Sequence, residues 1–598
     1  MFTRRSSVVA LALIFYFSSS LALMSQTHGG GGGRAPIPRV APRSNGGGSA
    51  PTAGNLPDTP ITHLASEEGK LEFRTETILI QVPVVITDKN GNHIHGLTKE
   101  NFRLLENGKE QTVSTFEEVV AANAKLPALP HRVVPGEFSN LFLPATQPRA
   151  LTVIALDTLN TPFLDQEYGR RELVKYLAQN IDTNQVLALM IMSSHGIKIV
   201  QGLTADSARL LEVLKKVSGE LPGNQDITLD AQADAATGNI PDVPMVSPGS
   251  DPSVAMEAFI ERGDAIYAQY QQQTALETTL GGLRAIAWSL SGVPGRKALI
   301  WATGGFPFAI TSPDAVPGGY LLALYERTMQ ALTEAQISVY PVDVRGLVNS
   351  TGMGDASRSR GPTAQQLNNR IWLQQSTIDS LNEFADMTGG KAFYNTNDLA
   401  TSFKRAADDG SSYYQLGYYL DTKNNRAGWR QLKVKVDKKD TEVRARKGFF
   451  VTNATIRAEL TRNSDMSYAL SSPIEGTGVP LTVKWLGNSP DGDKKKAQFL
   501  IRLPPNGVSL EGRDQNQLNF EFALAAYRDK SKDTKPAATL GKNVTKTMSP
   551  EQLATVRASG MGFTNAVELP AGQYNVRIVI RDNVTGKIGS VTAPLTVN

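Results

Sequence analysis

Polar side chains with oxygen atoms follow two largely apolar runs that lie far apart in the chain. Asp157 ends the run 151–156, and Thr161 stands four residues after it. Thr303 ends a second run, 297–302, and is followed by two glycines. If both runs are parallel strands, these ends meet at the edge of a sheet where α/β proteins bind ligands. One carboxylate and two hydroxyls at this edge are the kinds of oxygen ligand that Mg²⁺ or Mn²⁺ takes.

This set of oxygen atoms is small for a cation site. Magnesium requires near-octahedral oxygen coordination, usually with at least one carboxylate. Here one carboxylate and two or three hydroxyls are at hand. We therefore expect no bound cofactor, and we expect Asp157 to cap the turn after its strand. The alternative is a degenerate metal site in which Asp157, Thr161 and Thr303 hold Mg²⁺ or Mn²⁺ weakly.

Three further groups of side chains are better explained by structural roles. His93 and His95 would point to one face of a strand, but no third metal ligand is visible, so a solvated hairpin is expected. The serines and histidine of 193–195 are too close in sequence for a catalytic triad and suit a loop. Asp343 and Arg345 follow another apolar run and are expected to form an ion pair.

Composition and motifs exclude several activities. The 598 residues include no cysteine, which rules out thiol catalysis and cysteine-based metal sites. We find no nucleophile–base pair, no phosphate-binding glycine loop and no zinc motif, and therefore predict that the protein is not an enzyme. The formal charge is +4, and no Lys/Arg stripe is interleaved with aromatic residues. Nucleic acid is therefore not an expected partner.

The first residues have the pattern of an export signal. Arg4 and Arg5 precede the apolar stretch 8–17, and Ser20 and Ala22 form a small-x-small cleavage pattern. This stretch is short for a spanning helix, which needs about 20 residues, although a retained membrane anchor is the alternative. We predict an exported protein of the periplasm, cell surface or extracellular space, with no membrane span after cleavage of the signal.

Strand-like and helix-like patterns alternate between residues 150 and 410. Five apolar stretches are typical of buried strands: 151–156, 186–192, 298–302, 337–342 and 391–394. Helical periodicity separates them, for example in 276–290, where six apolar residues share one face before Gly292 and Pro294. Such alternation predicts an α/β, doubly wound parallel sheet of the Rossmann type.

Strand patterns flank the α/β region on both sides. The strands expected within 71–118 and 411–452 are too few on either side to close a core. We therefore predict that they pair as two halves of one split β-sandwich; two independent β extensions are the alternative. Alternating apolar and polar residues in 479–598 predict a C-terminal β-sandwich of immunoglobulin-like size.

The expected organisation has six parts. They are a signal peptide (1–25), a Gly/Pro-rich flexible linker (26–70), N-terminal β-strands (71–118), the α/β domain (150–410) with insertions at 218–253 and 346–365, the second half of the split sandwich (411–452), and the C-terminal sandwich (479–598). Both insertions are rich in Pro, Gly, Asp and Ser, which predicts surface loops.

Several stretches of the chain resemble the von Willebrand factor A-related family typical of acidobacterial secreted proteins. They are Val84–Phe102, Pro294–Pro307, Val339–Gly346, Tyr413–Tyr419 and Arg444–Phe450. The resemblance covers about residues 72–451. In von Willebrand factor A domains, an Asp-x-Ser-x-Ser loop, a distant Thr and a distant Asp hold a divalent cation, and a carboxylate of the partner completes the shell. Here the distant Thr would be Thr278 or Thr279.

Carried over by position, the cation site of that family is incomplete in this chain. Asp157 matches the first Asp of the loop and Thr161 its last hydroxyl, whereas Leu159 stands where the middle Ser is expected. Gly304, directly after Thr303, stands where the second Asp is expected. The resemblance therefore implies a degenerate metal-ion-dependent adhesion site.

The resemblance also implies a function. We expect a secreted, non-enzymatic protein-interaction or adhesion protein, whose von Willebrand A-like domain presents its crevice and insertion loops to a protein ligand. The alternative is a divalent-cation-dependent adhesin with an unusual coordination shell. The sequence sets neither the identity of the ligand nor the oligomeric state.

Overall fold

The computed structural model describes most of the chain from residue 78 onward. The described residues are 78–120, 136–140, 151–179, 185–219, 229–238, 240, 242, 251–293, 295–306, 319–347, 363–420, 428–451, 454–491, 494–511, 515–529 and 535–598. The predicted signal peptide and linker lie outside these residues, as does most of the predicted insertion 346–365. No helix in the described part of the chain is long and apolar enough to cross a membrane.

A five-stranded sheet forms the centre of the α/β region. Its order is β10-β9-β6-β7-β8, with β6 (Leu151–Asp157), β7 (Val186–Ser193), β8 (Gly196–Thr204), β9 (Lys297–Thr303) and β10 (Ile337–Asp343). The first four strands of that order run parallel, and β8 is antiparallel at one edge. Because β7 and β9 lie on opposite sides of β6, the direction of winding changes between β6 and β9. Open α/β sheets bind ligands at such a point.

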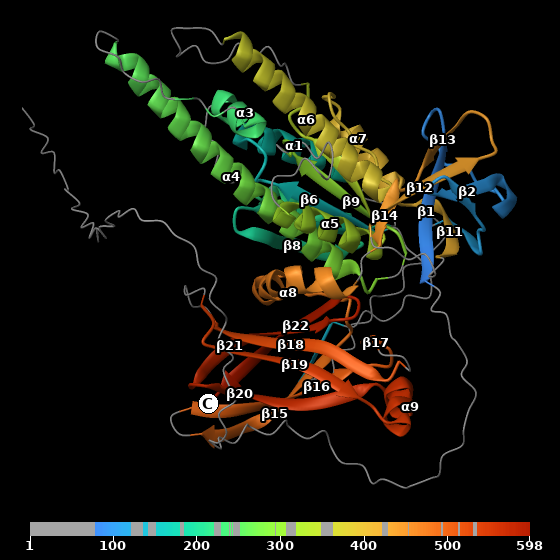
Figure 1. Ribbon diagram of the computed structural model, residues 1–598, viewed down its shortest axis with the longest axis vertical. Helices are drawn as coiled ribbons and strands as arrows, with labels where there is room; N and C mark the ends of the chain where they lie inside the picture. The colour runs from blue at the N-terminus through green and yellow to red at the C-terminus, as the bar shows by residue number, and fades with distance from the viewer. Residues whose placement is uncertain are drawn as a thin grey trace, which may run out of the picture. The chain divides into compact units, whose positions relative to one another are not determined.

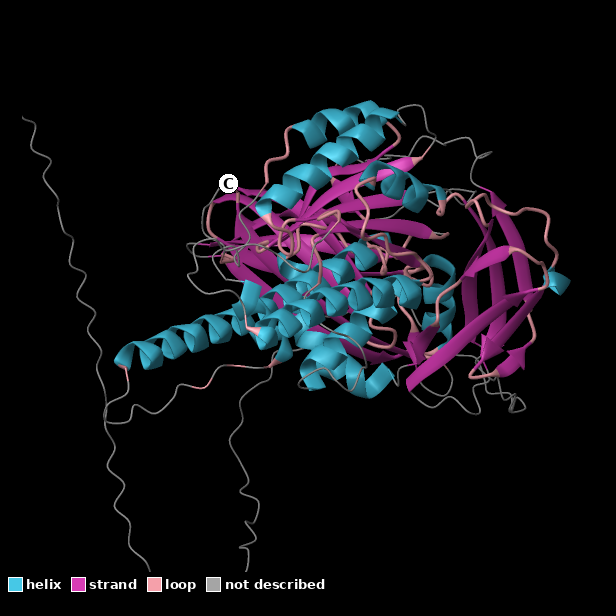
Figure 2. Cartoon of the chain, turned by 90° about the horizontal axis from the view of Figure 1, so that it is seen from above, coloured by secondary structure: helices cyan, strands magenta, loops and turns pink. Residues whose placement is uncertain are grey.

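Helices cover both faces of this sheet (Figure 1, Figure 2). One core contains side chains of α4 (Pro252–Leu290), α5 (Gly319–Glu334) and α6 (Ala364–Thr388). The other contains side chains of α1 (Phe163–Gln179), α2 (Ser207–Lys215) and α7 (Leu399–Asp408). Successive residues of a strand point to opposite faces, so Val153 and Ala155 enter the first core and Ile154 and Leu156 the second. This arrangement confirms the predicted mixed α/β architecture.

Strands from before and after the α/β region pair with each other. One sheet has the order β13-β1-β11-β4 and the other β14-β12-β2-β3. The strands are β1 (Ile78–Asp88), β2 (Phe102–Glu106), β3 (Lys109–Gln111), β4 (Thr115–Val120), β11 (Ser412–Leu420), β12 (Gly428–Val436), β13 (Thr441–Arg444) and β14 (Gly448–Val451). A short 3-10 helix, η1 (Lys99–Asn101), precedes β2. Both sheets contribute to one buried cluster, so neither half needs a core of its own.

The C-terminal region consists of two further sheets around a separate apolar core. Its elements are β15 (Thr482–Asp491), β16 (Lys494–Leu503), β17 (Leu510–Glu511), β18 (Gln517–Arg528), β19 (Ala538–Thr547), α9 (Pro550–Ser559), β20 (Met561–Leu569), β21 (Gly572–Asp582) and β22 (Ile588–Val597). The helix α8 (Ala454–Ser471) precedes them. The short strand β5 (Glu137–Ser139) pairs with β15, so a segment before the α/β region completes this sheet.

Two local expectations differ from the structure. The insertion 218–253, expected as a surface loop, contains the helix α3 (Leu229–Thr237), whose Ala231 and Ala235 pack on Ala268 of α4. The stretch 391–394, expected as a strand, makes only a single bridge from Phe393 to β10. It is short because α6 ends at Thr388, with Gly389 as its C-cap, just before it, and Asn395, with φ 53°, turns the chain just after it.

Candidate functional site

The three predicted site residues meet at the carboxyl edge of β6 and β9. Asp157 is 2% exposed, and its Oδ2 atom accepts hydrogen bonds from Thr303 Oγ1 at 2.8 Å and from Trp301 Nε1 at 2.9 Å. Thr161 Oγ1 accepts a bond from the backbone N–H of Gly304 at 2.7 Å. The carboxyl ends of β6 and β9 are therefore joined directly, by hydrogen bonds between side chains of the two strands and by one bond between the loops that follow them.

Asn160 occupies the centre of this arrangement. Its backbone N–H donates to Asp157 Oδ1 at 3.0 Å, which caps the turn after β6. Its side-chain Nδ2 donates to Asp157 Oδ2 and to Thr279 Oγ1, both at 2.8 Å. Sequence analysis missed Asn160. The available signal was its position three residues after Asp157, where an Asp side chain commonly accepts from the backbone.

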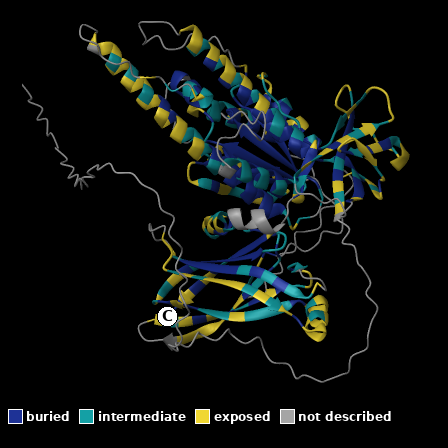
Figure 3. Cartoon of the chain, in the orientation of Figure 1, coloured by how far each residue is buried: buried dark blue, intermediate teal, exposed yellow. Residues whose placement is uncertain are grey.

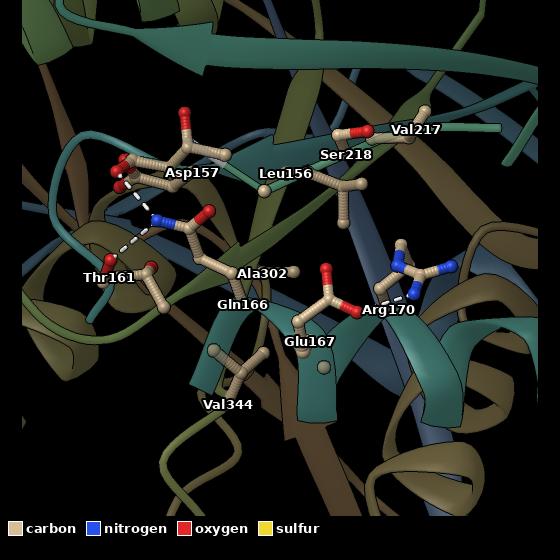
Figure 4. Close-up of a pocket in the computed structure, with 13 residues that line it drawn as sticks. Leu156, Asp157, Thr161, Gln166, Glu167, Arg170, Val217, Ser218, Ala302 and Val344 are labelled. Carbon is tan, nitrogen blue, oxygen red and sulfur yellow. Dashed lines mark hydrogen bonds and ion pairs between the residues drawn. The ribbon is translucent and has the colours of Figure 1, made fainter. Parts of the chain in front are cut away.

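The Asp157 loop is held from its other side as well. Gln166 of α1 donates from Nε2 to the carbonyl oxygens of Thr158 at 3.1 Å and Thr161 at 2.8 Å, as its orientation toward the loop in Figure 4 shows. Thr158 donates in turn to the carbonyl of Met192 at the end of β7. The loop is thus tied to three neighbouring elements.

Burial dominates the electrostatics of Asp157. Burial raises the pKa of its carboxyl group above the ordinary value, and the bonds from Asn160, Thr303 and Trp301 oppose that rise. A buried carboxyl group is stable only when its oxygens are hydrogen-bonded, and the Asp157 carboxyl group accepts four hydrogen bonds. The group is therefore a structural anchor whose lone pairs are largely engaged.

These residues do not fit a divalent cation. Asn160 Nδ2 carries only donor hydrogens, and it lies between Asp157 Oδ2 and Thr279 Oγ1, two oxygen atoms that a cation would need. A Cβ atom at Gly304, where the family's second Asp is expected, would lie 2.9 Å from both Asn160 O and Thr161 Cα. Among the described residues no group of three or more His, Cys, Asp or Glu could hold a metal ion.

A small cavity adjoins this site. Its volume is about 20 Å³, and Asp157, Thr161, Glu167 and Arg170 are among its lining residues (Figure 4). A cavity of this size has room for about one water molecule. Glu167 and Arg170 form an ion pair at its wall. The cavity is too small for an organic substrate.

The other candidates have structural roles. Arg345 binds Asp343 with two bonds of 2.9 and 2.8 Å, which confirms the predicted ion pair. His93 contacts the carbonyl of Asp408 at 3.1 Å, whereas His95 contacts Glu118 at 2.9 Å, so the two rings have different partners. Ser193 ends β7 and is buried, whereas Ser194 and His195 lie in the exposed turn between β7 and β8. The side chains of Ser194 and His195 contact each other at 3.2 Å, and the backbone N–H of His195 donates to Ser193 Oγ at 3.2 Å. These geometries show no shared metal clip and no catalytic triad in this described part of the chain.

No protein-family model and no curated protein matches the chain. Similar solved structures include an aerotolerance-related membrane protein from Bacteroides fragilis, 16% identical, with 43% of this chain and 98% of that chain covered and a TM-score of 0.21. A von Willebrand factor type A protein from Catenulispora acidiphila is 10% identical over 81% of this chain and 74% of that chain, with a TM-score of 0.21.

A third similar structure is the von Willebrand factor domain of a type V pilus tip protein from Porphyromonas gingivalis. It is 12% identical over 43% of this chain and 93% of that chain, with a TM-score of 0.16. Von Willebrand factor A domains are thus among the matched structures. At these identities and TM-scores they assign neither an activity nor a partner to this chain.

Proposed function

We propose that this chain is an exported, non-enzymatic binding protein that recognises a protein ligand at the carboxyl edge of its central sheet. In this proposal the α/β domain is von Willebrand A-like and of the Rossmann type, and its metal site is degenerate. The flanking β-domains, including an immunoglobulin-like C-terminal sandwich, serve as spacers and supports.

The exposed apolar rim of the carboxyl edge carries the proposal. Leu164, in the first turn of α1 after the Asp157 loop, is 80% exposed, and Leu347, after β10, is 64% exposed. The two segments are neighbours, since a Cβ atom at Gly346 would lie 3.7 Å from Tyr168 of α1. These two large apolar side chains are exposed at the same edge of the sheet, and we take this rim as the surface that meets the ligand.

The interior of the site favours binding over catalysis. Asp157 accepts four hydrogen bonds, and Thr303 donates its hydroxyl hydrogen to that carboxyl group. The Thr161 hydroxyl oxygen is taken by the Gly304 N–H. Groups engaged in this way hold the loops at the rim in one arrangement, and a rigid rim lowers the entropic cost of binding.

Export is tested by sequencing the N-terminus of the mature protein. The Arg4–Arg5 start and the Ser20–Ala22 pattern predict a mature chain that begins between residues 23 and 26 and is recovered outside the cytoplasm. A cytoplasmic protein that retains Met1 would contradict this part of the proposal.

Ligand recognition is tested by photo-crosslinking in intact producing cells. A photoreactive phenylalanine derivative at Leu164 or Leu347 should give one discrete adduct common to both positions, because both side chains border the same surface. The control position is Lys542, which is exposed on β19 of the C-terminal sandwich. Adducts that are the same at all three positions, or no adduct at either rim position, would contradict the proposal.

A further inference from the structure

The helix α4 carries apolar side chains on two opposite sides. On one side Ala265 and Ala268 are buried, and Ala268 packs on α3. On the other side six large apolar residues are exposed, and we refer to them as the α4 stripe: Met256, Phe259, Ile260, Ile266, Tyr267 and Tyr270. Within the described part of the chain their exposed fractions lie between 47% and 66%.

The α4 stripe is continuous along the helix. At 100° per residue its members fall within an arc of about 120°, centred opposite Ala265 and Ala268. From Met256 to Tyr270 it extends about 21 Å at 1.5 Å per residue. The N-terminal half of α4, which carries the stripe, projects beyond the neighbouring helices in two perpendicular views (Figure 1, Figure 2). Many of its residues are exposed (Figure 3). A contiguous apolar surface of this length, unlike single exposed residues, marks an interaction site.

Gly263 lies in the middle of the α4 stripe. It is exposed, and a Cβ atom added there would meet nothing within 4 Å. Glycine inside an exposed helix costs about 1 kcal/mol relative to alanine, and no contact within the described protein explains it. A residue without a side chain at the centre of an apolar stripe allows the backbone of a second helix to approach closely.

Charges beside the α4 stripe indicate which kind of helix fits. Glu257 and Asp264 are exposed along one border, one heptad apart. Near the other border, Arg262 is bridged to Asp242 at 3.4 Å. A second copy of this chain would place acidic borders together in an antiparallel pair. In a parallel pair of two copies, Glu257 and Asp264 of one copy would face Arg262 of the other, and Arg262 already has Asp242 as its partner.

We propose that the α4 stripe binds an amphipathic helix of a partner protein. The apolar face of that helix lies on the stripe, and a row of Lys or Arg residues faces Glu257 and Asp264. The inference rests on the proposed function, since it names the class of segment that the ligand presents. It places that segment beside the carboxyl edge, along a helix that contributes Thr279 to the site.

A binding measurement with the full chain and a defined probe tests this inference. The probe is a synthetic peptide of leucine and lysine with leucines at i, i+3, i+4 and i+7, and the matched peptide has glutamate in place of lysine. The lysine peptide should bind, and the glutamate peptide should bind more weakly. The double variant Phe259→Ser/Tyr267→Ser should lose about tenfold or more in affinity for the lysine peptide.

Matched variants show whether the peptide binds at the α4 stripe or at any exposed apolar side chain. Tyr419→Ser, at a residue 52% exposed on β11, should leave binding unchanged. Glu257→Lys/Asp264→Lys should reverse the preference toward the glutamate peptide. All of these residues are exposed, so the thermal midpoint of each variant should stay close to that of the unaltered protein.

Four results would overturn the inference. They are no binding of the lysine peptide, equal binding by the Phe259→Ser/Tyr267→Ser variant, equal binding of both peptides, and a dimer in sedimentation that this variant abolishes. The last result would make a second copy the occupant. If any of these four results occurs while the crosslinked adduct at Leu164 is still found, only the inference about the α4 stripe fails. If the adduct is absent while the lysine peptide still binds, the proposed function is contradicted.

Discussion

The side-chain nitrogen of Asn160 lies 2.8 Å from an oxygen of Asp157 and 2.8 Å from the hydroxyl oxygen of Thr279. These oxygens belong to segments more than a hundred residues apart, and the amide group joins them with its two hydrogens. A divalent cation would join the same oxygens by accepting their lone pairs. Asn160 therefore acts as a cation substitute built into the chain, and the edge of the sheet is fixed without an ion.

Replacing Asn160 with alanine should destabilise the protein. The variant keeps the backbone bond to Asp157 but leaves a buried carboxyl group and Thr279 without the amide donor. Hydrogen bonds to charged groups contribute about 1.5–3 kcal/mol, and this loss is expected in the free energy of unfolding measured with denaturant.

Asn92→Ala is the matched control for that measurement. Asn92 also donates from Nδ2 to an aspartate, Asp88, at 2.9 Å, but in an exposed turn. Water replaces the lost partner there, so the change should be about 0.5 kcal/mol or less. Equal decreases in the free energy of unfolding of the two variants would mean that the buried Asn160 amide stabilises the protein no more than the exposed Asn92 amide does.

Replacing Gly304 with alanine tests the close approach of the two loops. The new Cβ atom would lie 2.9 Å from Asn160 O and Thr161 Cα, so a loop must move, at a cost of about 1–3 kcal/mol. Gly202→Ala on β8 is the control, because a Cβ atom there meets nothing within 4 Å. If Gly304→Ala unfolds at the same denaturant concentration as Gly202→Ala, the contact that excludes a second carboxylate is absent.

His93 should make stability depend on pH. Burial lowers the pKa of His93 below its ordinary value of 6.5, so the unfolded chain binds a proton more readily than the folded protein does. Stability from this group is therefore full above pH 6.5 and is lost as the pH falls toward the lower folded-state pKa. The decrease in thermal midpoint between neutral and mildly acidic pH should be smaller in His93→Gln.

His195→Gln is the control for the pH series. His195 lies in the exposed turn between β7 and β8, so this variant shows the effect of removing a histidine that is not buried. A His93→Gln profile that parallels that of the unaltered protein would contradict the assignment to His93.

The position of the site could be predicted from sequence because short-range patterns define it. Asp157 and Thr303 are each the last residue of a buried strand, and parallel strands bring their carboxyl ends to one edge. The predicted ion pair of Asp343 and Arg345 is likewise local, since only one residue separates them along the chain. Mixed α/β architecture followed from the alternation of the same patterns.

Features that depend on long-range packing could not be predicted. The role of Asn160 requires Thr279, which belongs to a helix more than a hundred residues later. Helix α3 is short and lies in a segment of loop-like composition; its position depends on contacts such as Asp230 with Arg370 at 2.6 Å. The strand β5 has three residues, too few for a recognisable alternation, and forms because β15 offers an edge.

The most direct test of the cation substitute is thermal unfolding of the full chain in EDTA and across a titration of MgCl₂ or MnCl₂. A ligand that binds only the folded state raises stability by RT ln(1 + [L]/Kd). With Asn160 in the cation's place, the thermal midpoint should be the same in EDTA and in millimolar Mg²⁺ or Mn²⁺. A midpoint that rises with metal concentration in the unaltered protein, and no longer rises in Asp157→Asn, would contradict the account.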